Sequence, residues 1–375
     1  MAIVDVRAEF SGVSPTSHSL PIQGLRGLAA LAVVLFHARG WFPGASAWPF
    51  DERFGVLGVA VFFAISGMLM ADILPRTDPW RFLSHRVVRI YPLFLLLVAT
   101  WAVVGPATGA QKVGFHFLSL TLAPSGARYY YLGPEWTLIY ECSYYVALFA
   151  LALAGLQKHL IPVACAWLTA IAAAQLLPGW DGTFLPMGPT ILFKLPSVAF
   201  AGGLLIPTLT RRTPIGLSIV AIAVCFLFWP TTLSAQYWLA GVAATLLVLD
   251  VSRLHVPAPG FATLGDWSYA LYLCHLPAFL VAIKLAPDAP LAAGLLGAFG
   301  AAGFFGTLDV WLYKRLKTKV DRSPDELRKR SLFWFLLIFC AAAAVPGPIA
   351  GAVLPALVLI GGAYWIGKKV FGRKQ

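Results

Sequence analysis

The sequence predicts an all-α protein, a polytopic bundle of transmembrane helices, and three observations support this prediction. Hydrophobic residues make up 59% of the 375 residues. Charged residues make up only 12%, about half the share of a soluble domain. The 28 Lys and Arg residues occur in short groups between long apolar runs, whereas a nucleic-acid-binding protein carries them as a stripe on a polar chain. We therefore expect a lipid bilayer around the protein and no nucleic acid partner.

Each transmembrane element is expected where an apolar run of roughly 15–24 residues is bounded by Gly, Pro or charge. Such a run can cross hydrocarbon as a helix, because a helix satisfies its own backbone polar groups. Ten runs fit, and a two-helix hairpin follows at 332–345 and 347–366, whereas 113–123 is too short to span. In chain order the ten runs are 25–41, 55–74, 90–108, 136–155, 160–177, 187–206, 214–230, 236–250, 264–285 and 290–313.

The distribution of Lys and Arg over the loops predicts the orientation, because cytoplasmic loops are enriched in these residues. If the N-terminus is cytoplasmic, most of the basic residues lie on the inner side, including the dense group from Lys314 to Arg330. Only five then lie outside, and these are Arg39, Arg53, Lys112, Arg128 and Lys284. The sequence therefore predicts a multi-pass protein with both termini in the cytoplasm.

The first span carries Arg26 and His37, two polar residues at membrane depth. Eleven residues of α-helix turn through 1100° and rise about 16 Å, so both side chains lie on one face, within about 20° of one another. Arg26 is expected at the cytoplasmic mouth and His37 in the outer half. This face therefore offers an anion-binding group and a general base. The structural alternative is a snorkelling arginine and a histidine that only bonds a neighbouring helix.

The fourth span contains Glu141 at a depth that matches His37. A carboxylate and an imidazole at one depth could orient and polarise each other. A buried carboxylate is costly without a partner, so Glu141 is a candidate catalytic residue. The alternative is a structural ion pair with Lys194, which falls at similar depth in the sixth run.

Two further segments carry candidate site residues. Arg86 and Arg89 are three residues apart and share a helix face, where two guanidinium groups could bind phosphates; an interfacial amphipathic helix is the alternative. The ninth span places Ser268, Tyr272 and His275 within two turns, where helix packing is as good an explanation as chemistry. None of the common zinc or nucleotide-binding motifs occurs, so we expect no metal.

Five segments, in this order, resemble the acyltransferase-3 family of integral-membrane acyltransferases. They are the Arg-x10-His pair (Arg26, His37), the run 62–67 that ends in Ser66 and Gly67, the Arg-x-x-Arg pair (Arg86, Arg89), the segment from Trp136 through Glu141 to Tyr145, and the segment from Ser268 through Tyr272 to His275. Thr137 stands where the family commonly has Ser, which keeps the hydroxyl. The resemblance extends over residues 21–280.

The resemblance implies a bacterial inner-membrane enzyme that takes an acyl group, usually acetyl, from acetyl-CoA on the cytoplasmic side. The acceptor would be a hydroxyl of a glycan or a lipid-linked saccharide. Carried over to this chain, His37 is the expected catalytic residue and Glu141 supports it. Arg26, Arg86 and Arg89 would contact the phosphates of the coenzyme. Ser66, Trp136, Ser268, Tyr272 and His275 would support the site.

The expected organisation is a cytoplasmic segment at 1–20 and a ten-helix acyltransferase domain at 21–318. Residues 319–375 would form a basic linker, the extra hairpin and a basic tail. The competing interpretation is a transporter or flippase of a glycan or lipid intermediate, because buried Arg, His, Glu and Lys also suit such proteins. In a third interpretation the polar groups only hold helices together.

Overall fold

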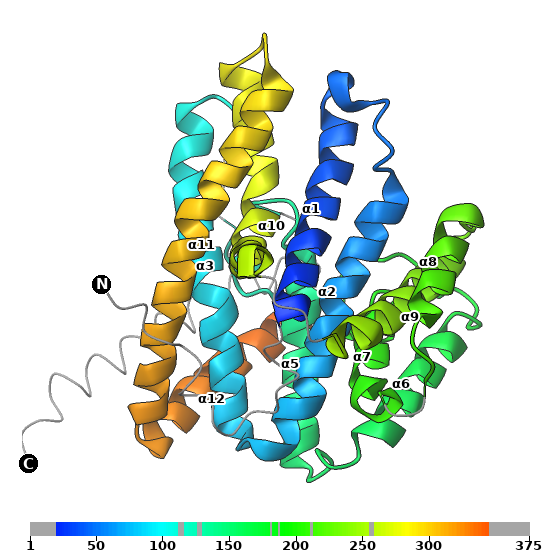
Figure 1. Cartoon of the computed structure of the whole chain (residues 1–375). Coiled ribbons are helices and arrows are strands. Elements are labelled where there is room, and N and C mark those ends of the chain that lie inside the picture. Colours follow the sequence, from blue (N-terminus) through cyan, green and yellow to red (C-terminus); the bar gives the residue numbers. More distant parts are fainter. Residues whose placement is uncertain are drawn as a thin grey trace, which may run out of the picture.

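A computed structural model describes residues 20–111, 116–125, 130–180, 182–186, 188–210, 213–254 and 259–344. Within these ranges the chain is helical and contains no strand. The longer helices α1, α2, α3, α10 and α11 run along one another as a bundle, while α6 to α9 form a group at its side (Figure 1). The observed fold is therefore the helical bundle that the composition predicts.

The first two helices form an antiparallel pair, α1 (Leu20–Trp41) and α2 (Glu52–Ile73), joined through the short 3-10 helix η2 (Pro43–Ala45). The start of α2 is fixed by Asp51, whose carboxylate accepts the backbone N–H of Arg53 at 3.0 Å. This is the usual way in which an N-cap residue satisfies a free amide. In the same way Asp78 accepts the N–H of Arg81 at the start of α3 (Pro79–Ala107).

The helix α10 (Pro259–Leu285) packs between α1 and the long helix α11 (Pro290–Arg322). On the far side of α1, the helix α2 packs against α7 (Ser197–Leu209) and α9 (Leu233–Ser252). The helix α3 packs against α11 and against α5 (Trp136–Leu153). The short elements are η3 (Leu74–Arg76), α4 (Phe117–Leu120), α6 (Leu160–Ala174), η4 (Pro189–Phe193) and α8 (Leu217–Leu227).

Close packing of α2 against α7 depends on two glycines that face each other. A Cβ on Gly67 would meet the carbonyl oxygen of Phe200, and a Cβ on Gly203 would meet the backbone of Ala64. Small residues of this kind let two helix backbones approach closely in a membrane. The contact brings Ser66, one residue before Gly67, into the interior of the bundle, where only 8% of its surface is exposed.

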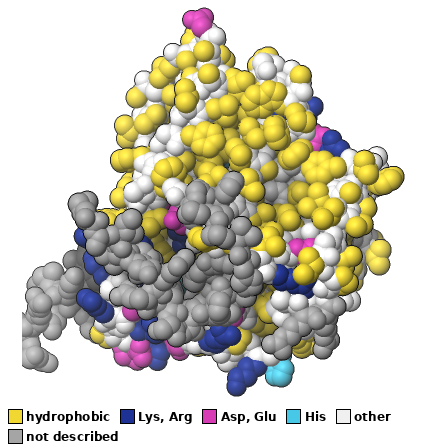
Figure 2. All heavy atoms as spheres, in the orientation of Figure 1, with side chains coloured by type: hydrophobic (Ala, Val, Ile, Leu, Met, Phe, Trp, Pro, Cys, Tyr) yellow, Lys and Arg dark blue, Asp and Glu magenta, His cyan; other side chains and the backbone are white. Residues whose placement is uncertain are grey.

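Seven of the described helices are long and apolar enough to cross a membrane. They are α1, α2, α3, α5, α9, α10 and α11, and the shorter apolar helices are α6, α7 and α8. Hydrophobic side chains cover much of the described part of the visible face, whereas charged side chains gather toward the end where α3 begins and α11 ends (Figure 2). The chain is thus a multi-pass membrane protein.

Three elements differ from the ranges expected from the sequence. The sixth run, 187–206, is divided into η4 and α7, with Lys194 and Pro196 between them, because proline lacks the amide that a continuous helix needs. The tenth run continues as a helix beyond 313 to Arg322, where α11 becomes basic. The third run, 90–108, is the later part of a longer helix, because α3 already begins at Pro79. The stretch 113–123, expected to be too short to span, contains the single turn α4 within its described part, 116–123.

The helix α12 (Asp325–Ala344) corresponds to the first half of the expected C-terminal hairpin. Its first six residues include five charged ones, and it is not among the helices long and apolar enough to cross a membrane. It packs against α3 and lies across the direction of the bundle (Figure 1). The second half of the hairpin, 347–366, lies outside the described residues.

Candidate active site

The helix α1 carries Arg26 in its first half and His37 close to its end. Both residues are partly buried, and the eleven-residue spacing separates them by about 16 Å along one helix face. The sequence places this pair on one continuous helix because the intervening residues are apolar, and most of those that face the bundle are small or β-branched. One element therefore connects the two ends of the site.

His37 contacts an imidazole from another helix. Its Nδ1 lies 3.0 Å from the carbonyl oxygen of Val33 and 3.1 Å from Nε2 of His275, on α10. The ring centroids of the two histidines are 5.0 Å apart. His275 is fully buried. The sequence suggested His275 only as a supporting residue, whereas the structure brings it into direct contact with His37.

Glu141 lies in a second polar cluster, with Ser66 and Tyr145. The hydroxyl of Ser66 donates to the Glu141 carboxylate at 3.3 Å and lies 3.1 Å from the hydroxyl of Tyr145. Tyr145, one turn after Glu141 on α5, donates to the same carboxylate oxygen. No hydrogen bond joins Glu141 to His37 in the described part of the chain. The structure therefore shows no direct contact through which Glu141 could polarise His37, as the sequence had led us to expect.

The three predicted arginines gather near this carboxylate cluster. Arg26 lies within electrostatic range of Arg89, Glu141 and Asp266. The guanidinium of Arg86 lies 5.8 Å from the centroid of the Tyr145 ring. Arg26 and Arg86 thus lie by the Glu141 cluster and Arg89 lies close to Arg26, with the carboxylates of Asp266 and Asp309 among them.

Arg86 and Arg89 differ in how the protein holds them. Arg89 donates to the carboxylate of Asp309, on α11, at 2.5 Å, and its guanidinium lies over the rings of Tyr269 and Tyr313. The Nε of Arg86 is buried and has no hydrogen-bond partner in the described protein. Arg89 is thus fixed by the fold, whereas the buried Nε of Arg86 makes no hydrogen bond within the described protein.

Among the described residues no ion pair joins Lys194 to Glu141, which was the structural alternative for this carboxylate. Its exposed fraction is only 2%, and its ammonium donates to the hydroxyl of Thr183 at 3.4 Å. Lys194 follows η4, at the break between η4 and α7. The hydrogen bond to Thr183 connects it to the segment that precedes η4.

The remaining predicted residues have mainly structural contacts. Ser268 donates to the carbonyl oxygen of Gly265 at 2.7 Å, within its own helix. Trp136 contacts the rings of Tyr140 and Phe184. Tyr272 lies close to the histidine pair, because its ring centroid is 6.1 Å from that of His275.

Sequence inspection missed Asp309, which has an exposed fraction of 3% and holds Arg89. The sequence could have indicated this residue, since an acidic side chain inside the apolar run 290–313 is as unusual as the polar residues chosen as candidates in the other runs. The role of Tyr145 as the donor to Glu141 was also missed. The i, i+4 spacing of these two residues on one helix would have indicated it.

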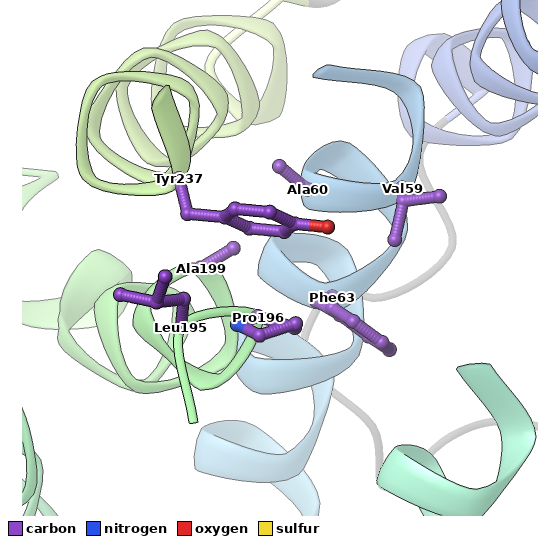
Figure 3. A pocket seen from close by; sticks show the side chains of 7 residues that line it. All are labelled: Val59, Ala60, Phe63, Leu195, Pro196, Ala199 and Tyr237. Atoms are coloured by element: carbon purple, nitrogen blue, oxygen red, sulfur yellow. The ribbon is translucent and has the colours of Figure 1, made fainter. Parts of the chain in front are cut away.

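Two pockets of about 190 Å³, their open mouths included, lie between the helices. One lies between α2, α9 and the start of α7, and its walls are apolar apart from the hydroxyl of Tyr237 (Figure 3). It contains none of the predicted site residues. The other lies between α3, α5 and α12 and is lined by Arg86, Tyr145 and Phe335 among others, so it adjoins the arginine cluster. Among the described residues no group of three His, Cys, Asp or Glu side chains could hold a metal ion.

Comparison with known proteins identifies the family. The model of the acyltransferase-3 family, described as an acyltransferase domain, matches residues 21–313. The membrane-bound transacylase BcsY of Komagataeibacter xylinus is 29% identical over 305 residues, which cover 72% of this chain and 75% of that protein. The exopolysaccharide production protein ExoZ of Rhizobium meliloti is 30% identical over 267 residues, covering 64% of this chain and 80% of ExoZ.

A third relative, nodulation protein 10 of Rhizobium leguminosarum, is 28% identical over 307 residues. The match covers 67% of this chain and 80% of the nodulation protein. No solved structure matches the chain. The family match spans α1 to most of α11, and therefore includes every helix that carries the histidine pair, the carboxylate cluster and the arginines. The chain belongs to the acyltransferase-3 family of membrane-bound acyltransferases.

Proposed function

We propose that this protein is an O-acyltransferase that moves an acyl group, acetyl above all, from acyl-CoA on the cytoplasmic side to a hydroxyl of a glycan or lipid-linked saccharide. One observation carries the proposal: α1 joins an arginine cluster at Arg26 to an imidazole at His37. The names of the relatives BcsY and ExoZ, a transacylase and an exopolysaccharide production protein, support the reaction and the saccharide acceptor.

The arginine cluster is the binding site that we propose for the phosphates of the coenzyme. Arg26, Arg86 and Arg89 would contact them, and the unpartnered Nε of Arg86 is suited to such a group, because guanidinium binds phosphate with paired hydrogen bonds. The rise of about 16 Å from Arg26 to His37 is comparable to the length of an extended pantetheine arm. A coenzyme held at the arginines would therefore present its thioester near His37.

In the proposed reaction His37 is the general base. Its free ring nitrogen removes the proton of the acceptor hydroxyl while that oxygen attacks the thioester carbonyl carbon. The carbon–sulfur bond then breaks, and the departing coenzyme thiolate takes the proton from His37. The products are an acyl ester and free CoA. A variant with an acyl group carried briefly on His37 would use the same residues.

The proposed orientation puts the two substrates on opposite sides of the site. Arg86 and Arg89 lie in the first half of α3, at the end of the bundle where charged side chains gather (Figure 2). His37 is four residues before the opposite end of α1. In a bacterial inner membrane with both termini in the cytoplasm, acyl-CoA would enter from the cytoplasm and the saccharide would approach His37 from the outer side.

Binding of acetyl-CoA to the purified protein separates this proposal from a transporter of saccharide or lipid. We expect acetyl-CoA to raise the thermal unfolding midpoint of the wild-type protein, since a ligand stabilises the state that binds it. The double variant Arg86→Ala/Arg89→Ala should lose this shift. Arg81→Ala is the control, because Arg81 is on the same helix but exposed and paired with Asp321. Absence of any shift in the wild-type protein would favour transport.

A further inference from the structure

The contact between His37 and His275 determines which ring nitrogens carry hydrogen. His275 comes from α10 and is fully buried, and its ring is enclosed by the edges of Tyr272 and Phe279 at centroid distances of 6.1 Å and 5.8 Å. Its Nε2 lies 3.1 Å from Nδ1 of His37. Two imidazole nitrogens at this distance share one proton, with one nitrogen as donor and the other as acceptor.

The surroundings of His275 make it the acceptor. Its Nδ1 lies 2.7 Å from the carbonyl oxygen of Tyr272 and 3.3 Å from that of Leu271. A carbonyl oxygen only accepts, so this Nδ1 must carry the hydrogen. The described residues supply no carboxylate as a hydrogen-bond partner of His275, and a buried imidazolium would need one. The ring is therefore neutral, and its Nε2 presents a lone pair to His37.

The same argument applied to His37 makes its Nδ1 the donor. This nitrogen lies 3.0 Å from the carbonyl oxygen of Val33 and 3.1 Å from the lone pair of His275. The Val33 oxygen also accepts the backbone amide of residue 37 within α1, and its second lone pair faces this ring nitrogen. Both neighbours of Nδ1 are therefore acceptors, and Nδ1 must carry the hydrogen that they share. Within the described part of the chain, Nε2 of His275 has no donor other than His37. With the hydrogen on Nδ1, the lone pair of His37 is on Nε2.

We infer that His275 is a positioning residue, which holds His37 in the Nδ1–H tautomer and turns its basic Nε2 toward the acceptor hydroxyl. The inference rests on the proposed function of His37 as the general base. When His37 takes the proton, its Nδ1–H remains bonded to the neutral His275, which spreads the positive charge that forms. A neutral imidazole thus takes the place that a carboxylate occupies in many catalytic triads, and Glu141 is left to the arginine cluster.

Two substitutions separate this role from packing. In His275→Gln the side-chain amide oxygen can lie near the place of Nε2 and accept from His37, whereas His275→Phe keeps the ring but has no acceptor. We expect acylation of the surface glycan in cells to remain within about threefold of wild type for His275→Gln. It should fall by about 100-fold for His275→Phe, since loss of the correct tautomer removes most of the base. Equal acylation by the two variants would overturn the inference.

A second measurement does not depend on activity. In protein labelled with ¹⁵N-histidine and placed in lipid nanodiscs, the ring signals of His37 are assigned by their loss in His37→Gln. We expect Nδ1 of His37 to be the protonated nitrogen in the wild-type protein, with Nε2 unprotonated. Protonation on Nε2 would overturn the inference even if His275→Phe failed to fold. If His37→Gln still supported acylation, the proposed function would fail while the tautomer result stood on its own.

Discussion

At the scale of single residues, Asp309 holds Arg89, one of the proposed phosphate contacts. Its carboxylate has an exposed fraction of 4% and bonds Arg89 at 2.5 Å. Removal of one partner from a buried pair leaves the other charge uncompensated, which costs about 3 kcal/mol. We expect Asp309→Asn to lower the free energy of unfolding by about this amount and to weaken acetyl-CoA binding. Thermal unfolding with and without acetyl-CoA measures both effects.

The matched control is Asp321→Asn. Asp321 also pairs with an arginine of α3, because it bonds Arg81 at 2.8 Å, but it lies at the exposed end of α11. Exposed ion pairs contribute less than about 1 kcal/mol. We therefore expect a small change in the unfolding midpoint and unchanged acetyl-CoA binding. Equal effects of the two substitutions would show that burial of Asp309 has no special role.

Part of this residue-level arrangement was predictable and part was not. The spacing from Arg26 to His37 predicts one helix face, because helix geometry is fixed by the number of residues between them. The partner of His37 was expected to be Glu141, at equal depth, whereas the structure provides His275. Depth follows from position along a span, but the direction in which a residue faces a neighbouring helix depends on packing, which a single sequence does not reveal.

At the scale of secondary-structure elements, the close approach of α2 and α7 requires glycine at the contact. A methyl group on Gly67 or Gly203 would meet backbone atoms of the other helix, which do not move as a flexible side chain would. We expect Gly67→Ala and Gly203→Ala each to lower the free energy of unfolding by about 1–3 kcal/mol. Because Ser66 adjoins Gly67, activity should fall as well. Thermal unfolding in detergent checks the first effect.

Gly300, on α11, is the control for this prediction. A Cβ at this position would meet no atom within 4 Å, and alanine favours helix over glycine by about 1 kcal/mol. Gly300→Ala should therefore leave the unfolding midpoint unchanged or slightly raised. A loss of stability at Gly300 as large as that at Gly67 would mean that loss of glycine itself, rather than the helix contact, is responsible.

The elements themselves follow closely from apolar runs and their boundaries. Long, uniformly apolar runs such as 55–74 and 136–155 correspond to α2 and α5. The run 187–206 does not form a single helix, because hydrophobicity predicts residence in the membrane but not helical continuity. Pro189 and Pro196 mark the beginning of η4 and the break before α7. Their presence would have been the signal for a divided element.

At the scale of the whole molecule, the account depends on the orientation in the membrane. In a variant without its five native cysteines, we would place one cysteine at Ala47, between α1 and α2, or at Glu326, at the start of α12. Both sites are exposed. A membrane-impermeant maleimide applied to spheroplasts should label Ala47→Cys, and should label Glu326→Cys only after the membrane is opened. The reverse pattern would place the arginine cluster on the wrong side for acyl-CoA.

The overall architecture was the most predictable level, because the composition alone excludes a water-soluble fold. The low charge content predicts the multi-pass helical bundle, and the order of five polar segments indicates the family that the match over 21–313 identifies. The location of α12 across the bundle (Figure 1) was not predictable from hydrophobicity. Its charged first turns and apolar remainder suit both a span and a helix that packs on α3.

Acylation of the surface glycan is the most direct test of the central claim, which is acyl transfer with His37 as the base. A strain that lacks this protein is complemented with the wild-type chain or with His37→Ala, and the acyl content of its surface glycans is measured by mass spectrometry. We predict that acylation is lost in the deletion strain, restored by the wild-type chain and not restored by His37→Ala. Unchanged acylation in the deletion strain, or full restoration by His37→Ala, would contradict the claim.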